Sequence, residues 1–232
     1  MAMGPAVRTA RSVGRSAPAL RKPIMRITRH DLPIILVNAA AIAFFTALSL
    51  RRENHEFLLY IVVILVMCVW FLAYKDRIAF DSLTLWGLTL WGVLHMAGGN
   101  IEVGDGVLYG LVLAPIWPKH SILRYDQAVH AFGFGVATMV GYQLLNPLLR
   151  PGLREGRRVG LLLVLIGCGI GAGNEIIEFV VVLALPRTGV GGYENTMWDL
   201  VFNFIGTVAA VSLIAWRRKR IRLKSSPCAA AL

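Results

Sequence analysis

Long apolar stretches separated by short polar or basic segments form the main pattern of this chain. Six of these stretches approach or exceed the ~17–25 residues that a helix needs to cross a bilayer. None alternates with the period of two that is typical of barrel strands, so we expect helices. The pattern predicts an all-α, polytopic membrane protein with about six transmembrane helices. The predicted helices cover residues 32–50, 57–74, 78–97, 127–148, 159–185 and 198–216.

The remaining segments divide the chain into a membrane domain, residues 31–216, and two basic tails, residues 1–30 and 217–232. A long outer loop is expected over residues 98–124. Within it, residues 107–117 are apolar but too short for a crossing, which predicts a re-entrant or interfacial segment. The first tail is rich in Arg, Ala and Ser, as organellar transit peptides are. We favour a cytoplasmic tail on a bacterial protein.

Composition and charge support a membrane protein and set its orientation. Of the 232 residues, 56% are hydrophobic and only 16% charged, whereas a soluble domain is about a quarter charged. Of the 24 Lys and Arg residues, 19 fall in the tails and even-numbered loops. This positive-inside pattern predicts that both termini are cytoplasmic in a multi-pass protein of the bacterial inner membrane.

The same distribution of charge decides which partners we expect. The net charge of +11 is divided among short segments beside the helices, which argues against a nucleic-acid partner. The basic tails are suited to anionic lipid headgroups, so membrane lipids are the expected partners. The sequence leaves the oligomeric state open.

Three pairs of polar or ionisable residues interrupt the last three predicted helices or their edges. The members of each pair are three or four positions apart, so on a helix they share a face. A charged side chain in hydrocarbon costs at least about 2.5–3.5 kcal/mol, which calls for a common explanation such as a shared polar pocket. The pairs are Asp126/His130, Glu175/Glu178 and Asp199/Asn203.

The direction of each predicted helix places these residues in the outer half of the membrane, where His95, Asn174 and Asn203 are expected to support the pocket. Each residue also has an ordinary structural interpretation. Asp126 and Asp199 could be helix N-caps in water. His95, Asn174 and Asn203 could make plain interhelical hydrogen bonds. Taken together, the residues predict one outward-facing pocket.

Glycines mark two further features. Gly167, Gly169, Gly171 and Gly173 form two overlapping Gly-x-x-x-Gly spacings in the fifth predicted helix. Small residues at this spacing let helices approach closely, so we expect tight packing just before the paired carboxylates. The glycines at 189, 191 and 192 predict a flexible outer loop.

The polar residues are suited to binding a divalent metal. Carboxylates with an imidazole favour Mn, Fe or Zn, and oxygen-only subsets favour Mg or Ca. The candidate ligands are Asp126, His130, Glu175, Glu178 and Asp199. The catalytic candidates are His130, Glu178 and Asp199, with His130 or Glu178 as general base. The metal would activate water or polarise a phosphoryl group in a lipid-linked or cell-envelope substrate.

Two other functions remain open at this stage. Intramembrane acids and histidines also occur in proton relays, so the chain could be a proton- or ion-coupled transporter. The predicted polar residues do not continue into the cytoplasmic half, and the sequence has no internal repeat of the kind that many transporters show. The third alternative is a non-catalytic membrane factor whose polar cluster only orders the helices.

The polar motifs also resemble those of a known family. The chain is similar to the uncharacterised bacterial inner-membrane family called YjdF-like and, more remotely, to VanZ-like proteins, which are linked to glycopeptide resistance. The similarity covers the third to sixth predicted helices and implies a multispan envelope protein. VanZ-like proteins commonly have Gln where this chain has Glu178. The motifs are Tyr125-Asp126-Gln127-Ala128-Val129-His130, Glu175-x-x-Glu178, Asp199-x-x-x-Asn203-x-x-Gly206 and His95-Met-Ala-Gly-Gly99.

Overall fold

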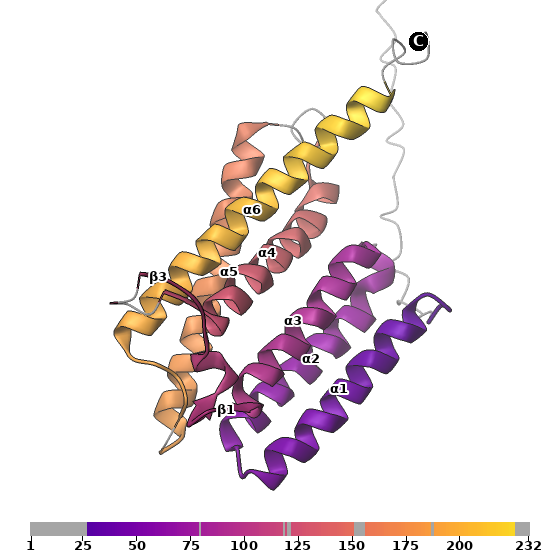
Figure 1. The fold of residues 1–232 in the computed structure, drawn as a ribbon. Helices are drawn as coiled ribbons and strands as arrows, with labels where there is room; N and C mark the ends of the chain where they lie inside the picture. Colours follow the sequence, from indigo (N-terminus) through magenta and orange to yellow (C-terminus); the bar gives the residue numbers. More distant parts are fainter. Residues whose placement is uncertain are drawn as a thin grey trace, which may run out of the picture.

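The computed structural model describes residues 27–78, 80–117, 119, 122–150, 156–186 and 188–225. Six long helices dominate this part of the chain, which confirms the all-α, polytopic architecture (Figure 1). Most of the two predicted basic tails lies outside the described residues. The helices are α1 Asp31–Arg51, α2 His55–Ile78, α3 Ser82–Asn100, α4 Tyr125–Leu145, α5 Arg157–Ala184 and α6 Tyr193–Ser225.

Five of these helices, all except α3, are long and apolar enough to cross a membrane. Helix α3 has 19 residues, and polar side chains at Thr84, Thr89, His95 and Asn100 reduce its apolar character. Thr84, Thr89 and Asn100 are buried, and α3 packs against α1, α2 and α4. Its polar groups therefore face other helices, as expected for a central helix of the bundle.

The helices form two groups, α1–α3 and α4–α6, which meet mainly where α3 packs on α4 (Figure 1). The chain has two apolar cores. The first core lies mainly in α1–α3 and includes Phe45, Phe57, Tyr60 and Met96, but Val181 of α5 also belongs to it. The second core includes Met139, Val159, Leu163, Ala210 and Ile214.

Helices α4 and α6 form the most extensive helix pairing among the described residues, and their backbones approach closely. A Cβ atom on Gly206 of α6 would lie 1.8 Å from the backbone oxygen of Ala131 on α4. Any side chain there would collide with backbone, so only glycine allows this approach. The glycine at the end of the Asp199–Gly206 motif thus determines how near the polar faces of α4 and α6 come.

The glycines of α5 divide into two different faces. A Cβ atom on Gly167 would lie 2.4 Å from Oγ1 of Thr138, and one on Gly171 would lie 2.9 Å from Nδ2 of Asn203. These two glycines pack against α4 and α6, as predicted. Gly169 and Gly173 have no such neighbour within 4 Å, so the second Gly-x-x-x-Gly spacing is not a packing surface among the described residues.

The connection between α3 and α4 consists of short strands and one turn of 3-10 helix. Strand β1, Glu102–Val103, pairs with β2, Gly106–Val107, and β3, Val112–Trp117, pairs with β4, Ile122–Arg124; both pairs are antiparallel. The 3-10 turn η1 covers Leu108–Gly110. The apolar stretch 107–117 therefore consists of one 3-10 turn and strand segments rather than a further long helix. Ile116 is 71% exposed, and an interfacial position for this stretch stays a prediction.

Helix α6 is longer than predicted at both ends and continues across the predicted domain boundary at residue 216. Beyond Trp216, the chain is rich in Arg and Lys, which are good helix formers. The guanidinium of Arg220 lies 4.1 Å from the ring centroid of Trp216, and that of Arg218 lies 5.6 Å from that of Tyr142. The first cation–π contact lies within the extended end of α6, and the second joins that end to α4.

Candidate functional site

Polar side chains on α4 and α6 face one another in rows that repeat every fourth residue. This spacing places each row on one face of its helix. The rows meet at three levels, which descend from the end of the bundle that carries the strands. Asn195 Nδ2 lies 3.5 Å from Asp126 Oδ2, His130 Nδ1 lies 3.0 Å from Asn203 Oδ1, and Thr138 Oγ1 lies 3.2 Å from Thr207 Oγ1.

Asp126 and Asp199 stand at the first level, and neither is an N-cap. The N-cap of α4 is Arg124, and Asp126 lies in the first turn, where the helix dipole favours negative charge. Helix α6 begins at Tyr193, so Asp199 lies more than a turn inside it and is only 1% exposed. The carboxylate of Asp199 accepts a hydrogen bond from Asn195 at 2.6 Å through Oδ2, while its Oδ1 has no partner among the described residues.

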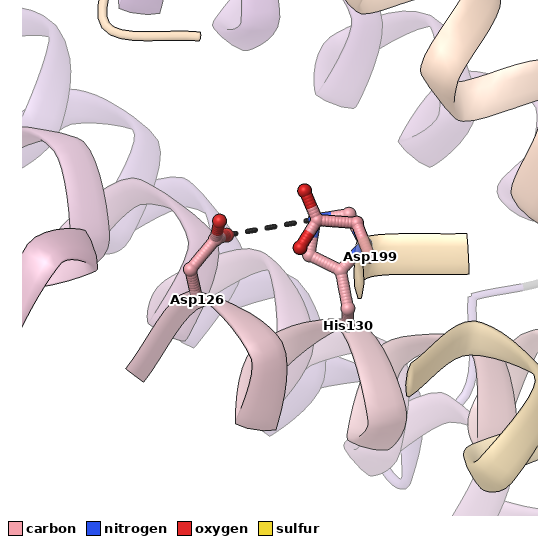
Figure 2. A group of neighbouring side chains, drawn as sticks. All are labelled: Asp126, His130 and Asp199. Atoms are coloured by element: carbon pink, nitrogen blue, oxygen red, sulfur yellow. Dashed lines mark ion pairs between the residues drawn. The ribbon is translucent and has the colours of Figure 1, made fainter. Parts of the chain in front are cut away.

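His130 occupies the second level, and its two ring nitrogens face different groups. Nδ1 lies 3.0 Å from the amide oxygen of Asn203. Because that oxygen can only accept, Nδ1 carries the hydrogen of this bond, and Nε2 is the nitrogen that faces the carboxylate of Asp126. Nε2 lies 3.5 Å from Oδ1 of Asp126. Figure 2 shows the Asp126 carboxylate directed toward the His130 ring, with Asp199 beside it.

Helix α5 brings two more carboxylates to the other side of His130. Glu175 is 8% exposed, and its Oε1 lies 3.7 Å from His130 Nδ1. Neither of its carboxylate oxygens has a hydrogen-bond partner among the described residues. Glu178 accepts a hydrogen bond of 2.7 Å from Nδ2 of Asn174, which is the supporting contact expected of that asparagine.

These residues form two overlapping groups that share His130. The first group is Asp126, His130 and Asp199, and the second is His130, Glu175 and Glu178; within each, the potential ligand atoms all lie within 4.8 Å of one another. Ligand atoms around a tetrahedral zinc ion are about 3.3 Å apart, given Zn–N distances near 2.0–2.1 Å. Small side-chain movements would therefore close either group on a cation. Buried oxygens without donors are rare in proteins and mark both groups as suited to a cation or a proton.

His95 belongs to neither group. Its Nδ1 is hydrogen-bonded to the hydroxyl of Tyr109 in η1, and its ring centroid lies 5.3 Å from that of Tyr60. Burial raises the pKa of Tyr109, which keeps its hydroxyl protonated and able to donate. Gly98 leaves room for the Tyr109 ring, since a Cβ atom there would lie 2.3 Å from it. His95 therefore positions the η1 connection over α3.

Asn195 is a site residue that the sequence reasoning missed. Its amide nitrogen lies between the carboxylates of Asp126 and Asp199, and its amide oxygen accepts from Arg124 at 3.4 Å. The sequence feature that could have identified Asn195 is its position four residues before Asp199. We predicted that the last helix begins at residue 198, and this start hid the spacing.

Gln127 was quoted only as part of a motif, and it orders the entry to α4. Its Oε1 accepts hydrogen bonds from the backbone nitrogens of Leu123 and Arg124 at 2.8 and 3.0 Å. Leu123 has a φ of 69°, a left-handed conformation that is uncommon for a branched side chain. Gln127 thus stabilises a strained turn that directs Arg124 toward Asn195.

Glu56 is a second residue that was missed, because it stands at the start of an apolar stretch. It is buried, and its Oε2 accepts a hydrogen bond of 2.6 Å from the backbone nitrogen of Gly189. This contact joins α2 to the loop between α5 and α6. The glycine loop that was predicted to be flexible is therefore attached to the first helix group at Gly189.

A small polar pocket adjoins the first group on the side of the strands. It has a volume of about 260 Å³, and its lining includes Lys119, Arg124, Gln127, Asn195 and Trp198. Asn195 belongs both to this lining and to the contacts of Asp126 and Asp199. The pocket thus places Lys119, Arg124 and the acidic Glu194 around Asn195.

Comparison with curated proteins and with solved structures found no match to this chain. The sequence profile of a family described as predicted membrane protein, DUF2238, matches residues 32–220. This range contains all the residues of the two groups and nearly the full length of the six helices. The chain therefore belongs to the DUF2238 family of membrane proteins, which is the YjdF-like family.

Proposed function

We propose that this protein is a metal-dependent enzyme of the bacterial inner membrane whose divalent cation is held by Asp126, His130 and Asp199. The observation that carries the proposal is the orientation of His130. Asn203 accepts from Nδ1 at 3.0 Å, so Nε2 faces the two aspartates. A histidine fixed in this way by an outer hydrogen bond is the usual arrangement of a metal ligand.

The donor set favours a catalytic metal over a structural one. One imidazole and two carboxylates suit Zn or Mn. Three protein ligands leave a position for water or substrate, as catalytic sites do. The buried Oδ1 of Asp199, which has no donor among the described residues, supplies a negative charge that a cation would neutralise.

Glu178 is the best candidate for general base. His130 has one nitrogen committed to Asn203 and the other directed at the aspartates, so it is better suited to binding metal than to moving protons. Glu178 is half-buried and held by Asn174 at 2.7 Å. A bound cation would activate water, and the Glu178 carboxylate would take up its proton. Glu175 completes the second group and is an alternative ligand.

The adjoining polar pocket supports an anionic substrate. Lys119 and Arg124 line it together with one acidic residue, Glu194, and a guanidinium is a common partner of a phosphoryl or carboxyl group. The positive-inside pattern predicts that this pocket lies on the outer face of the membrane. A substrate of the cell envelope follows from that orientation, and the remote VanZ-like resemblance points to the same compartment.

The proposal is tested by metal binding to the full-length protein in lipid nanodiscs. After treatment with a chelator, the wild type is expected to bind Zn²⁺ or Mn²⁺ stoichiometrically. Asp126→Asn and Asp199→Asn should lose the metal while they keep the unfolding temperature of the metal-free wild type. Asp81→Asn, which changes the N-cap of α3 at the other end of the bundle, is the matched control. A wild type that binds no divalent cation would overturn the proposal.

Catalysis is tested separately with Glu178→Gln. This variant should bind the metal as the wild type does but fail to release phosphate or another hydrolysis product from extracted envelope lipids. If both aspartate variants unfold, the cluster serves only to order the helices. Proton-coupled uptake into vesicles without hydrolysis would assign a transporter instead.

A further inference from the structure

A long apolar groove runs among α1, α2 and α3, and Phe134 of α4 and four residues of α5 complete its lining. Its volume is about 860 Å³, which is within the ~300–1,000 Å³ typical of ligand pockets. On α2, its lining residues recur at every third or fourth position from Tyr60 to Lys75. Fifteen residues of helix span about 22 Å, so the groove follows most of the height of a bilayer core.

The groove is apolar along its length and polar at its two ends. One end carries Asp31 and Lys75, whose charged groups pair at 2.7 Å. The other end carries Tyr60, His95 and Asn174. Midway, Asn38 and Thr89 also belong to the lining, and they satisfy each other through a hydrogen bond of 2.7 Å.

The polar end of the groove meets the second carboxylate group. Asn174, which lines the groove, donates to Glu178 at 2.7 Å. Phe134, also in the lining, lies with its ring centroid 5.7 Å from that of His130. A molecule in the groove would therefore end beside the residues that we assign to catalysis.

Two glycines border open space in the groove. Gly92 of α3 and Gly173 of α5 line it, and a Cβ atom on either would have nothing within 4 Å. Several lining side chains of α2 are also exposed, among them Leu65 and Val69. The groove thus opens sideways to the surroundings of the helices, which in a membrane are lipid chains.

We propose that the groove holds one hydrocarbon chain of a membrane amphiphile and presents its polar head to the carboxylate cluster. In a bilayer, lipid tails surround this apolar surface, so hydrocarbon fills an open apolar groove. The length of about 22 Å suits a single extended chain of a lipid. The polar head would then reach Glu178, with the metal ligands and the polar pocket beyond it.

The identification of this amphiphile as the substrate rests on the proposed function. The binding of its hydrocarbon chain in the groove does not. A substrate that is bound by its tail would enter from the membrane and not from water. The enzyme would then act on a lipid or lipid-linked molecule with an anionic head. Water-soluble analogues of the head alone would be poor substrates.

The test uses a phospholipid with a photoactivatable diazirine near the end of its acyl chain, in nanodiscs with the full-length protein. Crosslinks are mapped by peptide mass spectrometry. We expect them to concentrate on groove residues such as Met67, Cys68 and Ile170, relative to Leu161 and Leu165, which are exposed but do not line the groove. An even distribution over the exposed apolar residues would overturn the proposal.

Matched glycine variants test the groove directly. Gly173→Leu and Gly92→Leu place a side chain in open groove and should reduce crosslinking at Met67 and Cys68 at least fivefold. Gly169→Leu adds the same side chain on α5 where nothing lies within 4 Å and outside the lining, so it should leave crosslinking unchanged. If Gly173→Leu and Gly92→Leu crosslink at Met67 and Cys68 as strongly as Gly169→Leu does, the proposal is contradicted. A change from dimer to monomer in Gly173→Leu would also contradict it, because that change would assign the groove to a second copy.

Metal-free variants separate this proposal from the proposed function. Asp126→Asn and Asp199→Asn should crosslink as the wild type does, because neither residue lines the groove. If the wild type binds no metal but still shows groove-specific crosslinks, the chain-binding groove stands and the enzyme does not. Loss of crosslinking in both aspartate variants would show that the groove has no binding role of its own.

Discussion

The Nδ1 atom of His130 on α4 lies 3.0 Å from the amide oxygen of Asn203 on α6. This hydrogen bond joins the two helices in the interior of the bundle and decides which ring nitrogen faces Asp126 and Asp199. The two side chains are 73 residues apart in the sequence. The chemistry of the candidate site depends on their contact.

Replacement of Asn203 tests this dependence. Asn203→Leu should lower metal affinity about 10–100-fold, because the outer partner that orients His130 is lost. Asn203→Asp retains an acceptor for Nδ1 and should lose less. Asn38→Leu, which removes an intramembrane asparagine bonded to Thr89, is the control for a polar-to-apolar change. Wild-type affinity in Asn203→Leu, measured by calorimetry, would contradict the assignment of His130 as an oriented ligand.

The strained turn before α4 predicts opposite effects at two neighbouring positions. Gln127→Leu leaves the backbone nitrogens of Leu123 and Arg124 without their acceptor, and should destabilise the fold by about 1–3 kcal/mol. Leu123→Gly relieves a left-handed φ that costs a branched residue about 1–2 kcal/mol, and should be neutral or stabilising. Unfolding in detergent micelles measures both, and destabilisation by Leu123→Gly would show that the turn is not strained.

The close contact of α4 and α6 predicts that Gly206 tolerates no side chain. In Gly206→Ala, the new Cβ atom would collide with the backbone oxygen of Ala131, and overpacking of this kind costs about 1–3 kcal/mol. Gly169→Ala has open space and should be neutral or stabilising by about 0.5–1 kcal/mol. Thermal unfolding of the two variants should move in different directions, and equal shifts would argue against the contact.

The contact between Glu56 and Gly189 predicts a local change in exchange. Glu56→Leu removes the acceptor of the Gly189 amide, so hydrogen–deuterium exchange over residues 188–192 should become faster. Glu56→Gln keeps an acceptor oxygen and should exchange nearly as the wild type does. Unchanged exchange in Glu56→Leu would mean that the loop is held by other contacts.

The orientation of the protein is a prediction from charge alone. A periplasmic reporter enzyme fused after Arg187 should be active, because 19 of the 24 basic residues lie on the side assigned to the cytoplasm. The same reporter fused after Arg220 is the control and should be inactive. Activity in the opposite pattern would place the carboxylate cluster at the cytoplasmic face.

The sequence by itself determined the helices and the composition of the site. A segment in a membrane must satisfy its own backbone hydrogen bonds, so a long apolar stretch specifies a helix locally. The spacing of four likewise places Asp126 with His130, and Asp199 with Asn203, on shared faces. The helix ends were less well predicted: α6 begins at Tyr193, and this earlier start brings Asn195 into the site.

Only the tertiary structure decided which faces meet. Sequence spacing did not reveal that His95 pairs with Tyr109 or that Asn195 bridges the two aspartates. Helix contacts depend on where small residues such as Gly206 allow close approach, and local hydrophobic pattern does not encode the partner. The groove follows from the same cause, because an open space at Gly173 exists only where neighbouring helices leave it unfilled.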